Sequence, residues 1–328
     1  MLKKRNDEDF HTYACRLYDN KKEYGLNSQI IADLLNIQSG ENKTESAWRK
    51  FYKAFRAGIN YKSKNEVEVV NDKSTRILSI SDLHIPYQKS IQTFVEYRNK
   101  IDILQINGDV LDMQGISSFP KMYRHSPVLE MMEAKSYLVA LIKYLNPKKV
   151  ICNIGNHEYR LAAYVAKNFD TDLNCLLPKT PLELIFEDGF YYYDKKSPKK
   201  DYFSSIKSDI PEIEVQFVND WYCQIGNVIF AHPLAFSSAM MKTAEKAMLW
   251  FRNEGKTFSG LVLGHTHRIG MYAIGNTIVY EQGCCCETKS NNYTDGKLVN
   301  SQKEGFLYLE IDNNGDIIHD KTKQIIIK

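Results

Sequence analysis

Acidic, imidazole and amide side chains occur in five short blocks of this 328-residue chain, and each block directly follows an apolar run. The blocks are Asp82-Leu-His84, Asn107-Gly-Asp109-Val-Leu-Asp112, Gly155-Asn156-His157-Glu158, His232 and Gly264-His265-Thr-His267. Short apolar runs are typical of buried strands, and open α/β sheets concentrate their chemistry at the carboxyl ends of strands. If the five strands share a sheet, these polar side chains meet at one edge.

Carboxylate oxygens and imidazole nitrogens, without thiolate sulfur, suit divalent ions of intermediate softness. The blocks therefore predict two divalent metal ions, with manganese the first choice and iron, zinc, cobalt, nickel or magnesium the others. A bridging carboxylate can hold two ions about 3.5–4 Å apart, the spacing of two-metal hydrolysis. The cysteines at 284–286 have no ligand spacing relative to the blocks and are predicted to be small packing residues.

A simpler interpretation stays open for each block taken alone, namely a strand-to-helix turn in which the polar residue caps the next element. Asn156 has the residue type of a helix N-cap, and Asp112 could cap the turn that follows it. What favours a shared site is the recurrence of such residues after five separate strands.

The elements that must position these blocks alternate between strands and helices. Strands are predicted at 76–81, 101–106, 149–153, 228–231 and 260–263, and helices at 90–98, 130–145, 158–167 and 237–253. Such alternation predicts parallel pairing with helices on the faces. Hairpin turns at Gly226-Asn227, Gly275-Asn276 and Asn313-Asn-Gly315 predict a second, more antiparallel sheet against the first.

The first 65 residues have a different character. Residues 28–35 and 44–55 predict two helices, the first with Ser28 as its N-cap. The second helix has a basic outer face, and residues 1–65 contain 13 Lys and Arg against 8 Asp and Glu. A helix-turn-helix-like, DNA-binding module and a helical cap with solvated basic residues both fit. Residues 66–74 are polar and aperiodic, which predicts a linker to a domain over 75–328.

Composition narrows the class of protein. The chain is 43% hydrophobic and 25% charged, as in ordinary globular proteins, and its net charge of +3 does not by itself argue for a nucleic-acid or membrane partner. No apolar run approaches a membrane span, and the first residues lack the apolar region of a secretory signal. Seven cysteines without framework spacing predict reduced thiols and a cytoplasmic location. The sequence shows no coiled-coil heptad repeat, so it gives no indication of the oligomeric state.

Taken together and in this order, the five blocks resemble those of the calcineurin-like metallophosphoesterase superfamily over about residues 75–285. The resemblance implies an α/β fold, a two-sheet β-sandwich flanked by helices, here with a small N-terminal helical domain. It implies that Asp82, His84 and His267 hold one ion and that Asp109 bridges to the second ion. Asn156, His232 and His265 would complete the second ion.

The resemblance also implies a mechanism. A hydroxide shared by the two ions would attack phosphorus in line. His157 would protonate the leaving oxygen as the general acid, and Asp112 would orient His157.

Departures from the family pattern bear on the substrate. Protein Ser/Thr phosphatases of the family carry arginines at the positions of Met113 and Ile154, and the absence of both guanidinium groups disfavours that activity. Tyr159, Arg160 and Arg268 lie beside the blocks and are predicted to contact substrate. Arg160 fits a helix-surface residue equally well.

We therefore expect a metal-dependent phosphodiesterase that acts on nucleic acid, most of all DNA, in the manner of a nuclease. One alternative is a phosphodiesterase or phosphatase for nucleotides or other small phosphate esters. The other alternative is a non-catalytic DNA-binding protein with a structural metal site. It would be expected to have lost ligands or the acid, and the sequence retains them all.

Overall fold

The computed structural model describes residues 2–5, 8–67, 74–118, 125–168, 180–193, 200–289 and 302–327. The chain divides into two compact units, Met1–Asn65 and Glu66–Lys328. The predicted linker falls partly outside the described residues, at 68–73, whereas Glu66–Val67 forms a short strand that belongs to the second unit.

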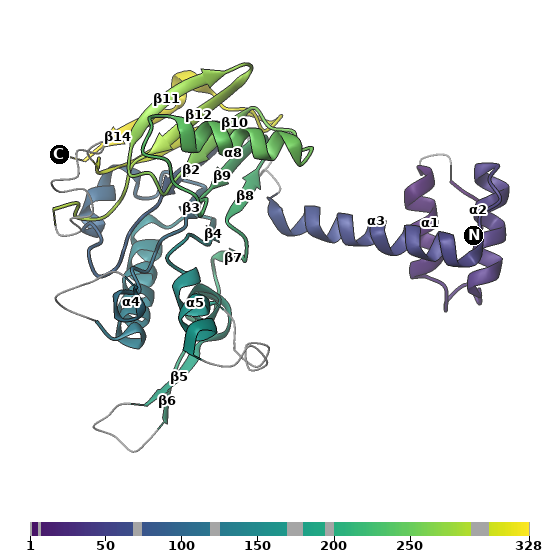
Figure 1. The fold of residues 1–328 in the computed structure, drawn as a ribbon, viewed down its shortest axis with the longest axis horizontal. Helices are drawn as coiled ribbons and strands as arrows, with labels where there is room; N and C mark the ends of the chain where they lie inside the picture. The colour runs from purple at the N-terminus through teal and green to yellow at the C-terminus, as the bar shows by residue number, and fades with distance from the viewer. Residues whose placement is uncertain are drawn as a thin grey trace. The chain divides into compact units, whose positions relative to one another are not determined.

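The first unit consists of three helices (Figure 1), α1 Phe10–Asp19, α2 Ser28–Ser39 and α3 Glu45–Asn65. Asn27, not the predicted Ser28, caps α2, because its side chain accepts the hydrogen bond from the Ile30 amide. The core of the unit is built from buried apolar side chains of all three helices, among them Leu17, Leu35 and Trp48. Helix α3 continues well past the predicted end at residue 55.

The second unit mixes strands with helices and short helical turns (Figure 1). In chain order these are β1 Glu66–Val67, β2 Thr75–Ile80, η1 Ile91–Tyr97, β3 Ile103–Asn107, η2 Gln114–Ile116, α4 Pro127–Leu145, β4 Lys149–Asn153, α5 Tyr159–Asn168, α6 Pro181–Glu183, η4 Leu184–Asp188, β5 Phe190–Tyr193, β6 Lys200–Phe203, α7 Ile206–Asp209, β7 Glu214–Val218, β8 Tyr222–Ile225, β9 Val228–Ala231, α8 Lys242–Asn253, β10 Gly260–Leu263, β11 Ile269–Ile274, β12 Thr277–Gln282, β13 Gly305–Ile311, η5 His319–Lys321 and β14 Lys323–Ile326.

Two six-stranded sheets form the centre of this unit, with strand orders β14-β13-β2-β3-β4-β7 and β1-β8-β9-β10-β12-β11. The prediction that the second sheet is more antiparallel was wrong. Hairpins do make β8–β9 and β11–β12 antiparallel, but α8 carries the chain from β9 to β10 as a parallel crossover. Each sheet therefore has three parallel and two antiparallel pairings.

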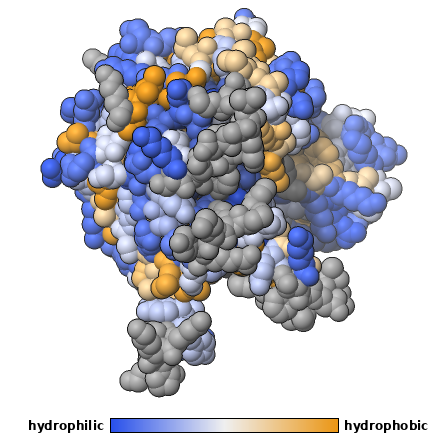
Figure 2. Space-filling view, turned by 60° about the vertical axis from the view of Figure 1, so that its left-hand side comes forward, coloured by the Kyte–Doolittle hydropathy of each residue, from blue (hydrophilic) through white to orange (hydrophobic). Residues whose placement is uncertain are grey.

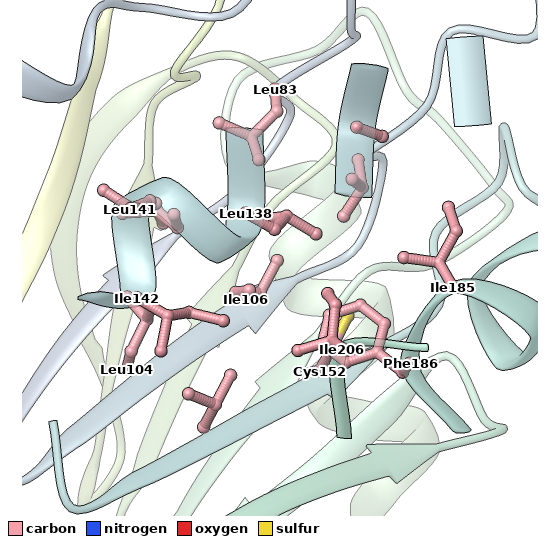
Figure 3. Close-up of a cluster of buried hydrophobic side chains, with 14 of the residues drawn as sticks. Leu83, Leu104, Ile106, Leu138, Leu141, Ile142, Cys152, Ile185, Phe186 and Ile206 are labelled. Atoms are coloured by element: carbon pink, nitrogen blue, oxygen red, sulfur yellow. The ribbon is translucent and has the colours of Figure 1, made fainter. Parts of the chain in front are cut away.

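Alternating side chains divide the apolar core into layers. Leu104 and Ile106 of β3 face α4, where they pack with Leu138 and Ile142 (Figure 3), while Ile103 faces the second sheet. Between the sheets lies a separate cluster that includes side chains from β2, β3, β4, β9 and β10. Helix α8 covers the outer face of the second sheet. The predicted fold class, a two-sheet sandwich flanked by helices, is confirmed. On the face seen in Figure 2, hydrophobic residues form separate patches among hydrophilic ones.

Candidate metal centre

All five sequence blocks lie at the carboxyl ends of central strands, but the strands come from both sheets. Three blocks follow β2, β3 and β4 of the first sheet, and two follow β9 and β10 of the second. Main-chain hydrogen bonds join the blocks, such as His84 N to Asp109 O at 3.1 Å. The His265 amide donates to Asp82 Oδ2 at 3.1 Å and so ties the two sheets together at the site.

The backbone of these blocks adopts a conformation that side chains disfavour. Nine non-glycine residues in the described part of the chain have positive φ, and five of them are predicted ligands. These five are Asp82, His84, Asp109, His265 and His267, with φ between +44° and +73°. Left-handed backbone at such residues costs on the order of 1–3 kcal/mol each and is concentrated at functional sites. The turns therefore aim side chains at one point at the expense of local stability.

On one side of the site, Asp82, His84 and His267 converge as predicted. His267 Nε2 lies 3.0 Å from Asp82 Oδ1 and 3.1 Å from His84 Nε2. Because ring nitrogens and carboxylate oxygens crowd together in this way, their lone pairs can share one cation.

On the other side, His232 joins Asn156 and Asp109. His232 Nε2 lies 3.2 Å from Asn156 Oδ1 and 3.2 Å from Asp109 Oδ2. Its Nδ1 lies 2.6 Å from the Asn107 carbonyl, which accepts the proton of Nδ1 and directs the Nε2 lone pair inward. His265 belongs to the same group, since its ligand atom lies within 4.8 Å of those of Asp109 and His232.

Asp109 connects the two sides. Its Oδ2 lies 3.2 Å from His232 Nε2 and 3.8 Å from His84 Nε2. Gly155 has to be glycine for this carboxylate to fit, because a Cβ there would collide with Asp109. The predicted bridging position is therefore occupied by a carboxylate that both halves can reach.

Attraction between buried carboxylates and imidazoles helps to hold the two sides of the centre together. Burial alone would raise the pKa of Asp109, but the imidazoles of His157 and His232 lower it well below its usual range. Burial alone would lower the pKa of His232, but Asp109 and Asp82 raise it to about 9. The carboxylates thus require positive charge beside them.

The donor set fits divalent cations. Burial, with His232 nearby, lowers the pKa of His265 to about 3, so this imidazole is neutral at neutral pH. Its Nε2 is buried and has no hydrogen-bond partner among the described residues. A neutral imidazole with a buried, unshared nitrogen beside carboxylates is the form in which histidine binds metals.

His157 and Asp112 lie beside the first group. His157 Nδ1 is 3.1 Å from Asp112 Oδ1, as the predicted orienting role requires. Burial lowers the pKa of His157 to about 4 despite the Asp109 charge. Arg160 Nη2 lies 2.8 Å from His157 Nε2, and because arginine only donates, this nitrogen accepts its hydrogen bond. Arg160 also donates to the main-chain oxygen of Asp112.

Two other predicted substrate contacts have different surroundings. Arg268 is buried and donates to the main-chain oxygens of Ser237, Ser238 and Ala239. It therefore secures this loop, and its contact with substrate stays a prediction. Tyr159 is half-buried and packs against the apolar core under the first sheet. Its contact with substrate stays a prediction.

Glu158 is a site residue whose role the sequence did not reveal. Its carboxylate accepts hydrogen bonds from the amides of Asp109, Leu111 and Gly155 at 2.7–3.1 Å. Burial and the Asp109 charge raise the pKa of Glu158 to about 7, while these amides oppose the shift. Glu158 fastens the β3 and β4 blocks to each other. Its place next to His157 in the sequence was the only signal.

The cysteine segment also lies closer to the site than predicted. Cys286 Sγ is within 4.8 Å of ring nitrogens of His84 and His267. A hydrogen bond with Cys286, and the nearby His267, lower the pKa of the Cys284 thiol to about 5 despite its burial. The prediction that these cysteines serve only for packing is incomplete.

Two pockets flank the centre. On the His232 and His265 side, Trp221, Phe236 and Trp250 line an apolar cavity of about 340 Å³, and the Phe236 ring centroid lies 5.8 Å from that of His265. On the His157 side, Arg160 and Lys167 line a second cavity of about 260 Å³. An aromatic pocket therefore lies near His265, and a pocket with two basic side chains lies near His157.

Two family models match separate parts of the chain. A family model described as calcineurin-like phosphoesterase matches residues 75–269, and one described as YonJ N-terminal domain matches residues 1–67. Over 71 residues, the chain is 36% identical to the SPbeta prophage-derived uncharacterized protein YonJ of Bacillus subtilis, covering 22% of this chain and 18% of that protein. The chain thus spans less than a fifth of the length of that curated relative.

Solved structures include distant matches to the same part of the chain. Vacuolar protein sorting 29 from Cryptosporidium parvum is 16% identical with a TM-score of 0.39, covering 78% of this chain and 98% of that one. A novel archaeal phosphodiesterase is 13% identical with a TM-score of 0.31, covering 77% of this chain and all of that one. A predicted phosphoesterase from Streptococcus pneumoniae is 12% identical, with a TM-score of 0.30 and coverage of 77% and 98%.

Among the described residues, none of the helices combines the length and apolar character needed to cross a bilayer.

The Glu158→Gln variant tests how the blocks are fastened. It keeps the shape of the side chain but directs an amide NH₂ group at backbone donors, so at least one buried N–H group loses its acceptor. We expect a loss of about 1–3 kcal/mol in the free energy of unfolding, measured with urea. The control is Glu212→Gln, at an exposed position, which should change stability by less than about 0.5 kcal/mol. Equal urea midpoints for Glu158→Gln and the wild type would contradict this role.

Proposed function

Because this chain belongs to the calcineurin-like phosphoesterase family, we propose that its centre hydrolyses phosphodiester bonds, with nucleic acid as the substrate. The family is one of metal-dependent phosphoester hydrolases. The observation that carries the proposal is the position of Asp109, whose carboxylate lies within 4 Å of imidazoles on both sides of the centre. This is the arrangement that a pair of divalent ions needs.

The residues that would hold the ions are the two groups described above. Asp82, His84 and His267 would hold one ion, and Asn156, His232 and His265 the other, with Asp109 shared. When bound, the ions would polarise the phosphoryl oxygens and lower the pKa of the attacking water.

His157 is suited to donate a proton to the leaving oxygen. Its Nδ1 lies against Asp112, which leaves Nε2 as the nitrogen directed to the substrate. Arg160 now donates to Nε2. A phosphate oxygen that draws the guanidinium away would leave Nε2 free to take a proton from solvent and pass it to the leaving alkoxide.

The aromatic pocket favours a substrate that carries a base. A cavity of about 340 Å³ is in the range of small-molecule sites. The Phe236 side chain is 54% exposed although it is apolar, so its ring is available for stacking. The Arg268 guanidinium also packs against the Phe236 ring, at 5.3 Å from the ring centroid. A base on this side and a phosphate at Arg160 on the other would place the scissile diester over the centre.

His157→Ala tests the reaction. With manganese, we expect cleavage of bis-p-nitrophenyl phosphate and of single- and double-stranded DNA. The variant should lose about 10²–10⁴-fold in kcat on DNA, whose leaving alkoxide needs a proton, and less on the nitrophenyl diester. His319→Ala, at an exposed histidine in η5, is the control. Cleavage of p-nitrophenyl phosphate alone would favour a monoester phosphatase. No turnover with two ions bound per chain would favour the non-catalytic alternative.

Phe236→Ala tests the substrate class. Loss of one stacking ring should reduce kcat/KM on a single-stranded oligodeoxynucleotide by about 5–150-fold, from about 1–3 kcal/mol per base. Hydrolysis of methyl p-nitrophenyl phosphate, which carries no base, should change little. Leu249→Ala removes an exposed apolar side chain of α8 outside the pocket and should affect neither substrate. A Phe236→Ala enzyme with an unchanged rate on the oligonucleotide would remove the base-stacking role.

We further propose that the first unit contributes DNA affinity, supported by the exposed Lys50 and Lys53 on α3. The double variant Lys50→Glu and Lys53→Glu should weaken DNA binding and reduce the slope of log K against log salt by about 2. Turnover of the small diester should stay unchanged. Lys100→Glu with Lys323→Glu, both exposed in the second unit, makes the same charge change as a control. DNA affinity equal to that of the control would contradict the proposal.

A further inference from the structure

The segment Cys284–Cys286 is fastened between two ligand-bearing parts of the centre. Cys285 N donates to Ser81 O, and Lys89 N donates to Cys285 O, so the segment pairs with the chain around Asp82 and His84. Cys286 itself forms a bridge with Gln88. On the other side, Cys284 N donates to Lys303 O, and Lys303 N donates to His267 O. The backbone therefore fixes where the thiols point.

The Cys286 thiol lies with the imidazoles of one ion position. Its sulfur and the ring nitrogens of His84 and His267 are all within 4.8 Å of one another, and all three residues are buried. Ligand atoms at such separations can all reach one divalent ion at distances of about 2.0–2.3 Å. The neighbouring Cys285 differs, because its thiol donates to Gly305 O and it belongs to the apolar core.

We propose that Cys286 is a thiolate ligand of the ion held by Asp82, His84 and His267. On binding, the Cys286 S–H bond breaks, the sulfur keeps the electron pair for the metal, and the proton passes to solvent. The other ion position has only oxygen and nitrogen ligands, so the two ions of this centre have unlike surroundings.

A thiolate changes which ion the position selects. Soft sulfur ligands favour zinc or iron, whereas oxygen ligands suit manganese and magnesium. The inference therefore replaces the expectation of manganese, at this position, with a thiophilic ion. It rests on the metal centre of the proposed function, but it makes a separate claim about one ligand.

Cobalt substitution tests the sulfur ligand by a readout other than activity. The full-length chain loaded with Co²⁺ should show a sulfur-to-cobalt charge-transfer band in the near ultraviolet. Cys286→Ser should lose the band, and Cys285→Ser, a matched neighbour, should keep it. Thermal unfolding of each variant confirms that the fold is intact.

Competition between zinc and manganese gives a second measurement. After dialysis against both ions, mass spectrometry gives the metal content per chain. Cys286→Ser should shift the zinc-to-manganese ratio toward manganese by at least about tenfold, since even outer ligand partners are worth 10–100-fold in affinity. An unchanged ratio would overturn the assignment.

The outcomes separate this inference from the proposed function. Two cobalt ions per chain without the band would end the thiolate assignment and leave the phosphodiesterase proposal standing. A band that also disappears in folded Cys285→Ser would exclude Cys286 as its specific source. No cobalt binding at all would overturn both.

Discussion

The centre depends on a buried carboxylate that must be surrounded by positive charge. Asp109 is almost fully buried, and its Oδ2 faces His84, His157 and His232 at 3.2–3.8 Å. Uncompensated burial of a carboxylate is among the most costly events in folding. The amides and imidazoles around Asp109 therefore compensate its buried charge, and the glycine leaves room for its carboxylate. Its other oxygen, Oδ1, accepts a hydrogen bond from the His157 amide at 2.8 Å, which links Asp109 to His157 through the backbone.

Packing in the two-sheet sandwich offsets the free-energy cost of the strained backbone at the centre. Five left-handed ligand residues cost several kcal/mol in total. Three packed apolar clusters, one between the sheets and one on each outer face, offset this cost. The sandwich also explains why ligands come from two sheets. Packing the sheets face to face brings the ends of β9 and β10 over those of β2, β3 and β4, which a single sheet could not do.

Sequence patterns indicated the candidate ligands, and that they would lie close together, because each one follows a strand whose apolar run is visible locally. They did not predict which sheet holds β9 and β10, because strand and turn signals are local, whereas strand order depends on pairing between distant segments. Cys286 escaped notice because its approach to His84 depends on pairing between segments nearly 200 residues apart. Arg268 follows His267 directly, yet its side chain turns back to three carbonyl groups. Adjacency in sequence gives the position of a backbone but not the direction of a long side chain.

Two positions that carry arginines in the family's protein phosphatases are apolar in this chain, and this difference bears on the charge of the substrate. Met113 and Ile154 are buried, so their positions belong to the apolar core and offer no guanidinium to a phosphate. A monoester dianion needs more cationic contacts than a diester, which carries one negative charge per phosphate. On this proposal, the guanidinium of Arg160, beside His157, would match the smaller charge. In the function that we propose, the aromatic pocket would provide binding energy through a base instead of through the phosphate. A diester with a base on one side of the scissile bond would contact both pockets, and a small inorganic or protein-bound phosphate would contact only one, which is why we propose the diester.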